Sequence, residues 1–558
     1  MKNIAACFVT ILLMLLVERA FAEPPHPIPE ARALMGEKKY ADAAKKLEAY
    51  LATNRFDGRA WSSYSECLHM TKQYHQAIEA ANKAIETGFN LSGQMYNIAC
   101  GYALLGKKEE AIAWLKKALD KGFAEQETLE KDDDLDSLRD DPRFIQLTGL
   151  KPPSGLSSSK QWEWDLDFMA RRMEQMHWNL YAKVTKETFL REIENLKADT
   201  GKLSSDRIRV RLSRILAMVG DGHTTLATFA EGEKSVARIP LHLRVFTDGL
   251  FVIGTPKSQL ELLGARVTRV GQLDVDEAMK RLRSYCSVDN DMGYLDSVPR
   301  RLMQLAALQE IGATTDEDVE FTFLFPNHST RTVKIALEPA SPAMTRRAQR
   351  PGYIYANSTS KVPTPLYLRD VDQPLTLENL DEAKAIYFGF HAVGESKGQR
   401  FSEFVDLMLK RIEEKNADYL IIDMRLNGGG NTGLVRPLID ALIKNDRINR
   451  PGHLYVIIGR ETFSAAQNTV NLIESNTHAT FVGEPTGSRP NFVGESTYLI
   501  LPYSKLRVYC SSRYWQHVTS TDQRNWVPPQ IAAELSYGDF NENRDPCLAA
   551  ILERIKIK

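Results

Sequence analysis

Two residues of the types used in nucleophilic catalysis, Ser464 and His223, stand on turns next to regular structure. Ser464 follows the apolar run Leu454–Ile458 and precedes a helical pattern over Gln467–Ile473. A serine on a strand-to-helix turn can present its hydroxyl to a substrate, and the helix dipole behind it favours developing negative charge. We therefore predict Ser464 as a nucleophile. The structural alternative is an N-cap serine in an ordinary α/β pair.

Three consecutive glycines follow the preceding apolar run, Tyr419–Met424. Glycine lets the backbone turn sharply and aim its N–H groups outward. Such donors, next to the amide of the residue after a nucleophile, can stabilise an oxyanion. We expect Gly429, Gly430 and Ala465 to supply these donors.

The two segments DMRLNGGG and ETFSAAQN resemble the glycine signature and the nucleophile turn of the S41 serine peptidases. That family includes the C-terminal processing peptidases, the tricorn core and the retinoid-binding-protein repeats. The resemblance covers about residues 160–545. It implies a serine-type peptidase with an α/β catalytic core.

His223 lies in the turn segment VGDGHTT, which ends a helical block. A neutral imidazole can take a proton from serine and return it to a leaving amine, with an ordinary pKa near 6.5. A packing or surface histidine is the alternative. DGHT resembles the segment that supplies the general base in the tricorn-like branch, where a serine stands in place of Gly222. Thr224 is a candidate to orient the ring. We expect an activity pKa of about 6–7 unless burial or Asp522 moves it.

The segment GEPTGSR separates two mechanisms within the resemblance. In the C-terminal processing branch a lysine base lies in a motif like GExTxGKG, and the nearest basic residue here is Arg489. Arginine stays protonated and cannot act as a general base. His223 is therefore the predicted base. Arg489 is predicted to bind a substrate carboxylate, with a structural ion pair as the alternative.

A Ser–His pair generally needs a third group that holds the imidazole. In the tricorn core an acid shortly before a V-x-P-D-like strand has this role. The segment TSTDQRNWVPPQI offers Asp522, with Gln523 as its nearest competitor, and has PQI in place of PDI.

The elements that must position these residues follow from hydrophobic periodicity. Over residues 161–235 apolar residues recur at helical spacing between Trp162 and Leu216, which predicts a helical bundle. Residues 236–340 predict a β-rich domain, and LLGARVTRVGQLDVDEAM resembles a PDZ-like module. Residues 341–558 alternate strands and helices, which predicts a parallel α/β catalytic core with its active edge at the strand C-termini. The elements expected in it are Ile386–Phe390, Phe401–Lys415, Tyr419–Met424, Leu434–Lys444 and Leu454–Ile458.

An internal repeat of 34 residues occupies much of residues 23–150. Ala43, Ala77 and Ala111 share one position of the repeat, where a small side chain lets paired helices approach closely. This period is that of tetratricopeptide repeats and predicts an α-solenoid, whose concave face would hold a protein partner or another domain. A helical spacer without a ligand is the alternative. Residues 151–160 have linker composition.

Length, charge and the N-terminus bound the class of protein. The 558 residues carry 71 basic and 72 acidic side chains, so no strongly basic field indicates nucleic acid. Residues 1–22 have a lysine, an apolar run and an A-x-A cleavage site before Glu23, typical of a secretory signal peptide. We expect a periplasmic or secreted protein without a membrane span. Neither a metal-ligand spacing nor a cofactor motif occurs, and Cys67 and Cys100 are candidates for a disulfide.

Together these observations predict an exported serine-type peptidase that cleaves peptides or protein tails through an acyl-enzyme formed by Ser464 and His223. An S41-like scaffold without activity and a small-ligand carrier are the alternatives. A covalent serine probe discriminates them, because only an active enzyme reacts.

Overall fold

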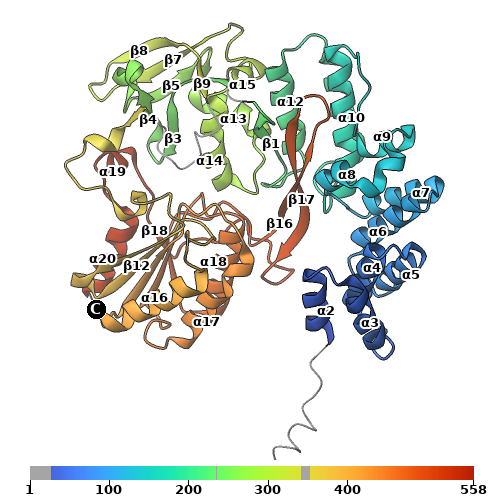
Figure 1. The fold of residues 1–558 in the computed structure, drawn as a ribbon. Helices are drawn as coiled ribbons and strands as arrows, with labels where there is room; N and C mark the ends of the chain where they lie inside the picture. Colours follow the sequence, from blue (N-terminus) through green and yellow to red (C-terminus); the bar gives the residue numbers. More distant parts are fainter. Residues whose placement is uncertain (1–26, 234–235, 341–351, 558) are drawn as a thin grey trace, which may run out of the picture. The chain divides into compact units, whose positions relative to one another are not determined.

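The computed structural model describes residues 27–233, 236–340 and 352–557, which form two compact units, Met1–Ser154 and Gly155–Lys558 (Figure 1). The predicted signal peptide, residues 1–22, lies outside the described residues. No helix in the described ranges is long and apolar enough to cross a membrane.

The first unit is helical. Three of its helices begin at Tyr40, Tyr74 and Lys108, so their starts follow the 34-residue period of the sequence. The repeated alanines at 43, 77 and 111 are buried on these helices, where they allow close packing. The bounds are α2 (Pro27–Gly36), α3 (Tyr40–Leu51), α4 (Gly58–Met70), α5 (Tyr74–Glu86), α6 (Leu91–Leu104), α7 (Lys108–Asp120), α8 (Gln126–Lys131) and α9 (Pro142–Thr148). The helical region is confirmed, and its tetratricopeptide-like nature stays a prediction.

The cysteines of the described residues are unpaired. Cys67 and Cys100, the candidates for a disulfide, are both buried free thiols. The expectation that they pair is therefore wrong for this structure. Both side chains fill the packing between helices, as small apolar groups do.

The second unit begins with the expected helices, α10 (Ser158–Met176), α11 (Lys186–Asp199) and α12 (Ser205–Ala217). Ser157, Thr185 and Ser204 are their N-caps, and each hydroxyl accepts a hydrogen bond from an amide of the first turn. After α12 the chain turns through His223 into β1 (Thr225–Ala230).

A β-rich region follows, as predicted. Its sheet has the order β10-β4-β5-β7-β8, with β3 paired to β4 and β6 paired to β5. The strands of the whole region are β2 (Val236–Arg238), β3 (His242–Phe246), β4 (Gly249–Pro256), β5 (Arg266–Val270), β6 (Leu273–Asp274), β7 (Val319–Leu324), β8 (Thr330–Ile335), β9 (Glu338–Ala340) and β10 (Tyr353–Tyr355), of which β2 and β9 pair separately. Its helices are α13 (Val275–Leu282), α14 (Asp291–Leu302) and α15 (Leu305–Glu310). Its PDZ-like character stays a prediction.

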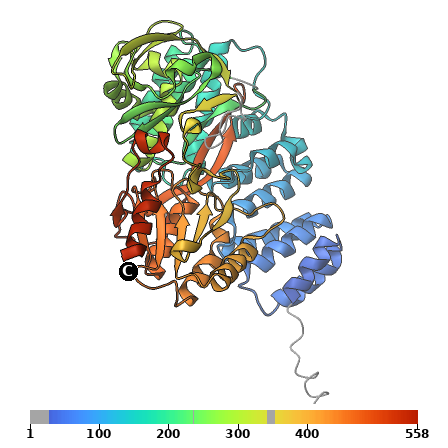
Figure 2. The same ribbon diagram turned by 90° about the vertical axis from the view of Figure 1, so that its left-hand side faces the viewer.

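The α/β core is a six-stranded sheet of order β11-β12-β13-β14-β15-β18, in which only the β11 pairing is antiparallel. Figures 1 and 2 show helices on both of its faces. Alternate strand residues pack against α16, α17 and α18 on one face and against α20 on the other, as the side-chain period of two requires. The bounds are β11 (Leu375–Leu380), β12 (Ala385–Phe390), α16 (Phe401–Glu414), β13 (Tyr419–Asp423), α17 (Arg436–Lys444), β14 (Leu454–Ile458), α18 (Ala465–Asn476), β15 (Thr480–Gly483), β18 (Ile531–Ala532) and α20 (Pro546–Ile557).

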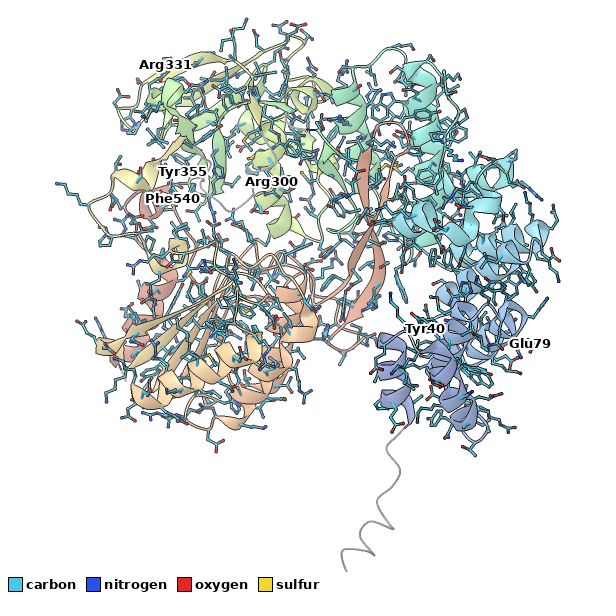
Figure 3. The ribbon with its side chains drawn as sticks, viewed as in Figure 1. Tyr40, Glu79, Arg300, Arg331, Tyr355 and Phe540 are labelled. Carbon is cyan, nitrogen blue, oxygen red and sulfur yellow. The ribbon has the colours of Figure 1, made fainter. Side chains whose placement is uncertain are left out.

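Two connections bring the parts of the second unit together. The long hairpin β16 (Asn491–Ile500) and β17 (Leu506–Gln516) leaves the core and pairs with β1 in a separate sheet of order β1-β17-β16 (Figure 1). Helix α19 (Tyr537–Asn541) reaches the β-rich region, where Figure 3 shows Tyr355 and Phe540 near each other. The hairpin was not predicted, and it places core residues beside His223.

Candidate active site

The serine turn has the backbone that a projecting nucleophile needs. Ser464 lies between β14 and α18 with φ 58° and ψ −124°, a conformation that L-residues rarely adopt. A Cβ on Gly429, whose φ is +108°, would lie 2.7 Å from the Ser464 Cβ. The glycine turn after β13 can therefore approach the serine only because it has no side chain there.

Asn427 joins the glycine turn to the serine turn. Its carbonyl oxygen accepts from the Phe463 amide at 3.0 Å, and its side-chain Nδ2 donates to the Phe390 carbonyl at 2.9 Å. Its Oδ1 accepts from the Gly429 amide at 3.0 Å. This fully buried asparagine, which sequence reasoning passed over, fixes both turns at the ends of neighbouring parallel strands.

The structure brings Ser464 and His223 together although 241 residues separate them. The Nε2 of His223 lies 2.9 Å from the Ser464 Oγ, within hydrogen-bonding distance. Ser464 is partly exposed, whereas the imidazole is buried. When Nε2 accepts the serine proton, the ring carries its own proton on Nδ1, and this nitrogen is buried without a hydrogen-bond partner among the described residues.

Aromatic rings hold the imidazole on both flanks. The His223 ring stacks on Phe463 with centroids 4.4 Å apart and on Phe492 of β16 at 5.4 Å. Burial lowers the pKa of His223 to about 4, although the charges of Asp221 and Glu495 act in the opposite direction. Burial therefore moves the pKa of the proposed base below the range of about 6–7 expected for an unburied ring, because a packed ring loses the hydration that stabilises its cation.

Close packing explains the glycine before His223, where the tricorn-like pattern has a serine. A Cβ on Gly222 would lie 2.8 Å from the Phe463 ring and 3.3 Å from the Asp289 Oδ1. A serine could not enter this space without displacing the ring that flanks the imidazole. Thr224 does not orient the imidazole either, since its hydroxyl donates to the Asp221 Oδ2 at 2.9 Å.

Asp522 does not reach His223, so its prediction as the third catalytic group is corrected. Its carboxylate accepts from the Nε of Arg524 at 3.0 Å, and Arg524 also pairs with Glu474 at 2.8 Å. The hydrogen bond from Arg524 lowers the pKa of Asp522. Gln523, its competitor, is exposed. Arg524, two residues further along the chain, therefore binds the carboxylate of Asp522.

The three amides predicted as oxyanion donors differ in whether they already donate a hydrogen bond. The Gly429 amide already donates to Asn427, so the expectation that it binds an oxyanion is corrected. The amides of Gly430 and Ala465 have no acceptor among the described residues. Ala465 is the first residue of α18, where helix geometry leaves an N–H group without an internal partner.

Arg489 does not form, among the described residues, the structural ion pair weighed as its alternative, and its binding of a substrate carboxylate stays a prediction. Its Nε donates to the main-chain carbonyl of Asp289 at 3.0 Å, and it forms no ion pair with a described carboxylate. Burial is the largest cause that lowers the pKa of Lys183, and the positive charge of Arg489 nearby is the second. Two cations therefore stand near the Ser464–His223 pair.

A second buried histidine supports the turn that carries His223. The His177 Nδ1 accepts from the Asn179 amide at 3.0 Å, so its proton lies on Nε2, which donates to the Asp221 Oδ2 at 2.9 Å. Burial opposes ionisation of Asp221, but hydrogen bonds from His177, Ser511 and Thr224 outweigh burial and lower its pKa. Because Asp221 also accepts from the His223 amide at 2.9 Å, this network holds the backbone of the turn.

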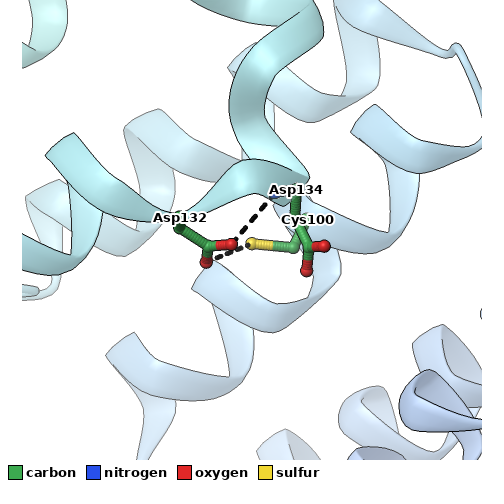
Figure 4. Close-up of side chains that lie close together, drawn as sticks. All are labelled: Cys100, Asp132 and Asp134. Atoms are coloured by element: carbon green, nitrogen blue, oxygen red, sulfur yellow. Dashed lines mark hydrogen bonds between the residues drawn. The ribbon is translucent and has the colours of Figure 1, made fainter.

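A potential metal-ligand cluster lies in the other unit. Cys100, Asp132 and Asp134 place three ligand atoms within 4.8 Å of one another (Figure 4). Burial, and then the charge of Asp132, raise the pKa of the Cys100 thiol well above its ordinary value. The protonated thiol donates to Asp132, which also accepts from the Tyr96 hydroxyl at 2.6 Å. The cluster is satisfied by its own hydrogen bonds.

Cavity size does not locate this chemistry. A cavity of about 670 Å³ lies between α12, β1, β2 and α15 and is lined by arginines that include Arg207, Arg209 and Arg301. Neither Ser464 nor His223 belongs to its wall. The short contact between these two side chains is therefore the feature that marks the candidate active site.

Comparison with known proteins agrees with this geometry. Residues 389–531, which include Ser464 and the glycine turn, match the family described as Peptidase family S41. The chain contains a serine-type peptidase domain of family S41. Residues 65–152 match a family described as the N-terminal domain of A/B hydrolase-like proteins, which is not the tetratricopeptide repeat expected for this region. No curated protein matches the chain.

Solved structures align with 71–73% of this chain, and the fold of one of them, mature CPAF, is similar. Mature CPAF in complex with lactacystin aligns with a TM-score of 0.50 and 13% identity, over 72% of this chain and 98% of CPAF. The photosystem II D1 C-terminal processing protease aligns with a TM-score of 0.33 and 13% identity, over 71% of this chain and 97% of that protein. The tricorn protease aligns with a TM-score of 0.34 and 14% identity, over 73% of this chain and 38% of that protein.

Proposed function

We propose that the chain is an exported serine peptidase in which Ser464 is the nucleophile and His223 the general base. The observation that carries this proposal is the 2.9 Å contact between the His223 Nε2 and the Ser464 Oγ. A lysine base is unsupported, since the lysine-like position holds Arg489, which stays protonated.

The reaction runs through an acyl-enzyme. The Ser464 Oγ attacks the scissile carbonyl carbon while its proton passes to the His223 Nε2, and the negative oxygen lies against the amides of Gly430 and Ala465. The imidazolium returns the proton to the leaving amine as the C–N bond breaks. Water then gives a proton to Nε2 and attacks the ester carbonyl carbon. The imidazolium returns that proton to the Ser464 Oγ as the ester C–O bond breaks, which releases the acid and restores both residues.

The substrate is a peptide or a protein tail, and Arg489 binds a carboxylate of that substrate. Its guanidinium lies near Lys183, and the residue before it, Ser488, accepts from the Ser464 amide, so the two cations form a positive region next to the serine turn. A substrate that ends close to the cleaved bond would place its terminal carboxylate there. Arg489→Gln should raise KM for such a peptide and leave KM unchanged for the same peptide with a C-terminal amide.

The other parts of the chain have supporting roles in this proposal. The β-rich region is a PDZ-like module, the N-terminal helices form a tetratricopeptide-like solenoid that binds a protein partner, and residues 1–22 direct export to the periplasm or outside the cell. The 34-residue spacing of the helix starts supports the second of these roles.

A fluorophosphonate probe tests the mechanism, because it forms a covalent bond only with an activated serine. The wild-type protein should be labelled at Ser464, and Ser464→Ala should abolish labelling while the melting temperature stays within a few degrees. His223→Ala should reduce labelling by several powers of ten, since base and nucleophile act as a unit. A wild-type protein that is folded and unreactive would instead be a scaffold or a ligand carrier.

A further inference from the structure

The segment before α14 belongs to the β-rich region by sequence, yet its side chains contact the α/β core. Asn290 donates to the carbonyls of Thr486 and Asn525 at 3.0 and 2.7 Å, and its Oδ1 accepts from the Gly293 amide as the N-cap of α14. The residue beside it, Asp289, is thereby held next to the loop that follows β15.

Asp289 accepts a hydrogen bond from the turn that carries the proposed base. Its side chain is buried, with 6% of the residue exposed, and its Oδ1 accepts from the Gly222 amide at 2.8 Å. The second carboxyl oxygen, Oδ2, is buried without a hydrogen-bond partner among the described residues within ordinary distance. Burying a carboxyl oxygen without a hydrogen-bond partner costs free energy, which distinguishes Asp289 from an ordinary surface acid.

A serine hydroxyl extends this contact to the nucleophile. The Ser464 amide donates to the Oγ of Ser488 at 3.3 Å, and Ser488 is fully buried. The Ser488 hydroxyl in turn lies near enough to Asp289 to stabilise its negative charge. One carboxyl group therefore stands between the amide before His223 and the hydroxyl that binds the amide of Ser464.

We propose that Asp289 is a positioning residue that sets the Ser464 Oγ and the His223 Nε2 at their reacting distance. This inference rests on the proposed function. Without the carboxyl, the partly buried Gly222 amide loses its acceptor and the turn can shift by fractions of an ångström. A misplacement of about 1 Å can lower a rate by about 100-fold, so Asp289→Ala should slow acylation of Ser464 by about 10- to 100-fold.

Burial, more than the surrounding charges, makes the protonation state of Asp289 change near pH 6. Burial, followed by the charge of Asp221, raises the pKa of Asp289 to about 6, whereas the Gly222 amide, the Ser488 hydroxyl and the Lys183 cation act in the opposite direction. Arg489 contacts the main-chain carbonyl of Asp289. The ionised carboxyl of Asp289 can accept a hydrogen bond from the Ser488 hydroxyl, whereas a carboxyl protonated on Oδ2 cannot accept one there. The acylation rate should therefore increase with pH through an inflection near pH 6.

Three variants test the proposal: Asp289→Ala, the isosteric Asp289→Asn, and Asp291→Asn as the matched control. Asp291 is an exposed acid two residues further on that pairs with Arg283. Rates of fluorophosphonate labelling per folded molecule are measured from pH 4 to 9. Asp289→Asn keeps an acceptor for Gly222, so it should lose less rate than Asp289→Ala but should lose the inflection near pH 6. Asp291→Asn should match the wild type at every pH.

Hydrogen exchange supplies a readout that does not depend on enzymatic activity. Peptides that contain Gly222 and Ser464 should both exchange faster in Asp289→Ala and remain protected in Asp291→Asn. Wild-type rate and protection in folded Asp289→Ala would overturn the proposal, as would an inflection near pH 6 that persists in Asp289→Asn. A folded wild-type protein that does not react with the probe would refute the proposed function but not the role of Asp289. Hydrogen exchange at the Gly222 and Ser464 turns would still show whether Asp289 holds both turns in place.

Discussion

The pH dependence of Ser464 acylation should show a base with an unusually low pKa. The proposed base must be neutral to accept the serine proton, and burial lowers the pKa of His223 to about 4. At pH 5 a group with that pKa is about nine-tenths neutral, whereas an imidazole with the ordinary pKa of about 6.5 is only about 3% neutral. In Asp289→Asn, which lacks the inflection assigned to Asp289, the enzyme should therefore retain at pH 5 most of the rate that it has at neutral pH, which a solvated histidine would not allow.

Phe492→Ala is the perturbation that tests the cause of this shift. The Phe492 ring stacks on the imidazole with their planes 7° apart, so its removal admits water to one flank of His223. A shift of about 2.5 pKa units corresponds to about 3 kcal/mol, and restoring hydration on one side should recover about 1 pKa unit of it. The acid limb should move from about pH 4 towards pH 5. Phe492→Leu, which keeps the site apolar, should move it less.

The assay is the second-order rate of fluorophosphonate labelling against pH, with Tyr498→Ala as the control. Tyr498 lies on the same strand and is exposed, so its removal should leave the limb unchanged. The shallow inflection near pH 6 assigned to Asp289 is separated from this limb by repeating the measurement in Asp289→Asn. An acid limb near 6.5 in Asp289→Asn, or a limb that Phe492→Ala does not move in that background, would refute the reasoning.

The same shift predicts a stability change that needs no substrate. The pKa of His223 is lower in the folded protein than in the unfolded chain, so the unfolded chain binds more protons between about pH 4 and 6.5. The contribution of His223 to stability therefore rises with pH across that window, by about 3 kcal/mol in total. Asp289, with its raised pKa, contributes a loss of stability as the pH rises from about 4 to 6. The free energy of unfolding should thus rise more steeply with pH in Asp289→Asn than in the wild type.

Three further outcomes are expected. Gly429→Ala should abolish labelling and destabilise the protein by about 1–3 kcal/mol in urea unfolding, because its φ is +108° and a Cβ would meet Ser464 at 2.7 Å; wild-type labelling would contradict the tight approach of the two turns. Asp522→Asn should change neither the rate nor the pH profile, since its carboxylate contacts Arg524, and a tenfold loss would restore it as a candidate. Deleting residues 23–150 should leave a folded unit that still reacts with the probe, as circular dichroism and labelling can show; an unfolded product would make the N-terminal unit a structural support.

Much of the local structure followed from residue patterns. The apolar runs Leu454–Ile458 and Tyr419–Met424 became neighbouring parallel strands, because β-branched and aliphatic residues in short runs fit a sheet buried on both faces. The apolar run before Ser464 and the helical pattern after it predicted its strand-to-helix turn. The helix starts of the first unit followed the repeat, since each repeat is one packing unit.

Other features could not be reached from local patterns, because they depend on side chains that are distant in sequence. His223 and Ser464 were proposed as partners from a resemblance, and their 2.9 Å contact exists only because the hairpin β16–β17 and β1 form a sheet between the core and the helical bundle. Asp522 had a suitable position in the chain, but Arg524 binds its carboxylate.

Residue types and spacing therefore determined which groups could do chemistry and on which turns they stand. Tertiary packing decided their protonation and their partners. A pKa depends on the water and charge around a group, and Phe463 and Phe492 exclude water from His223 although they lie more than 200 residues away in sequence. The same packing buried Asp289 against the Gly222 amide, a contact that no local pattern signals.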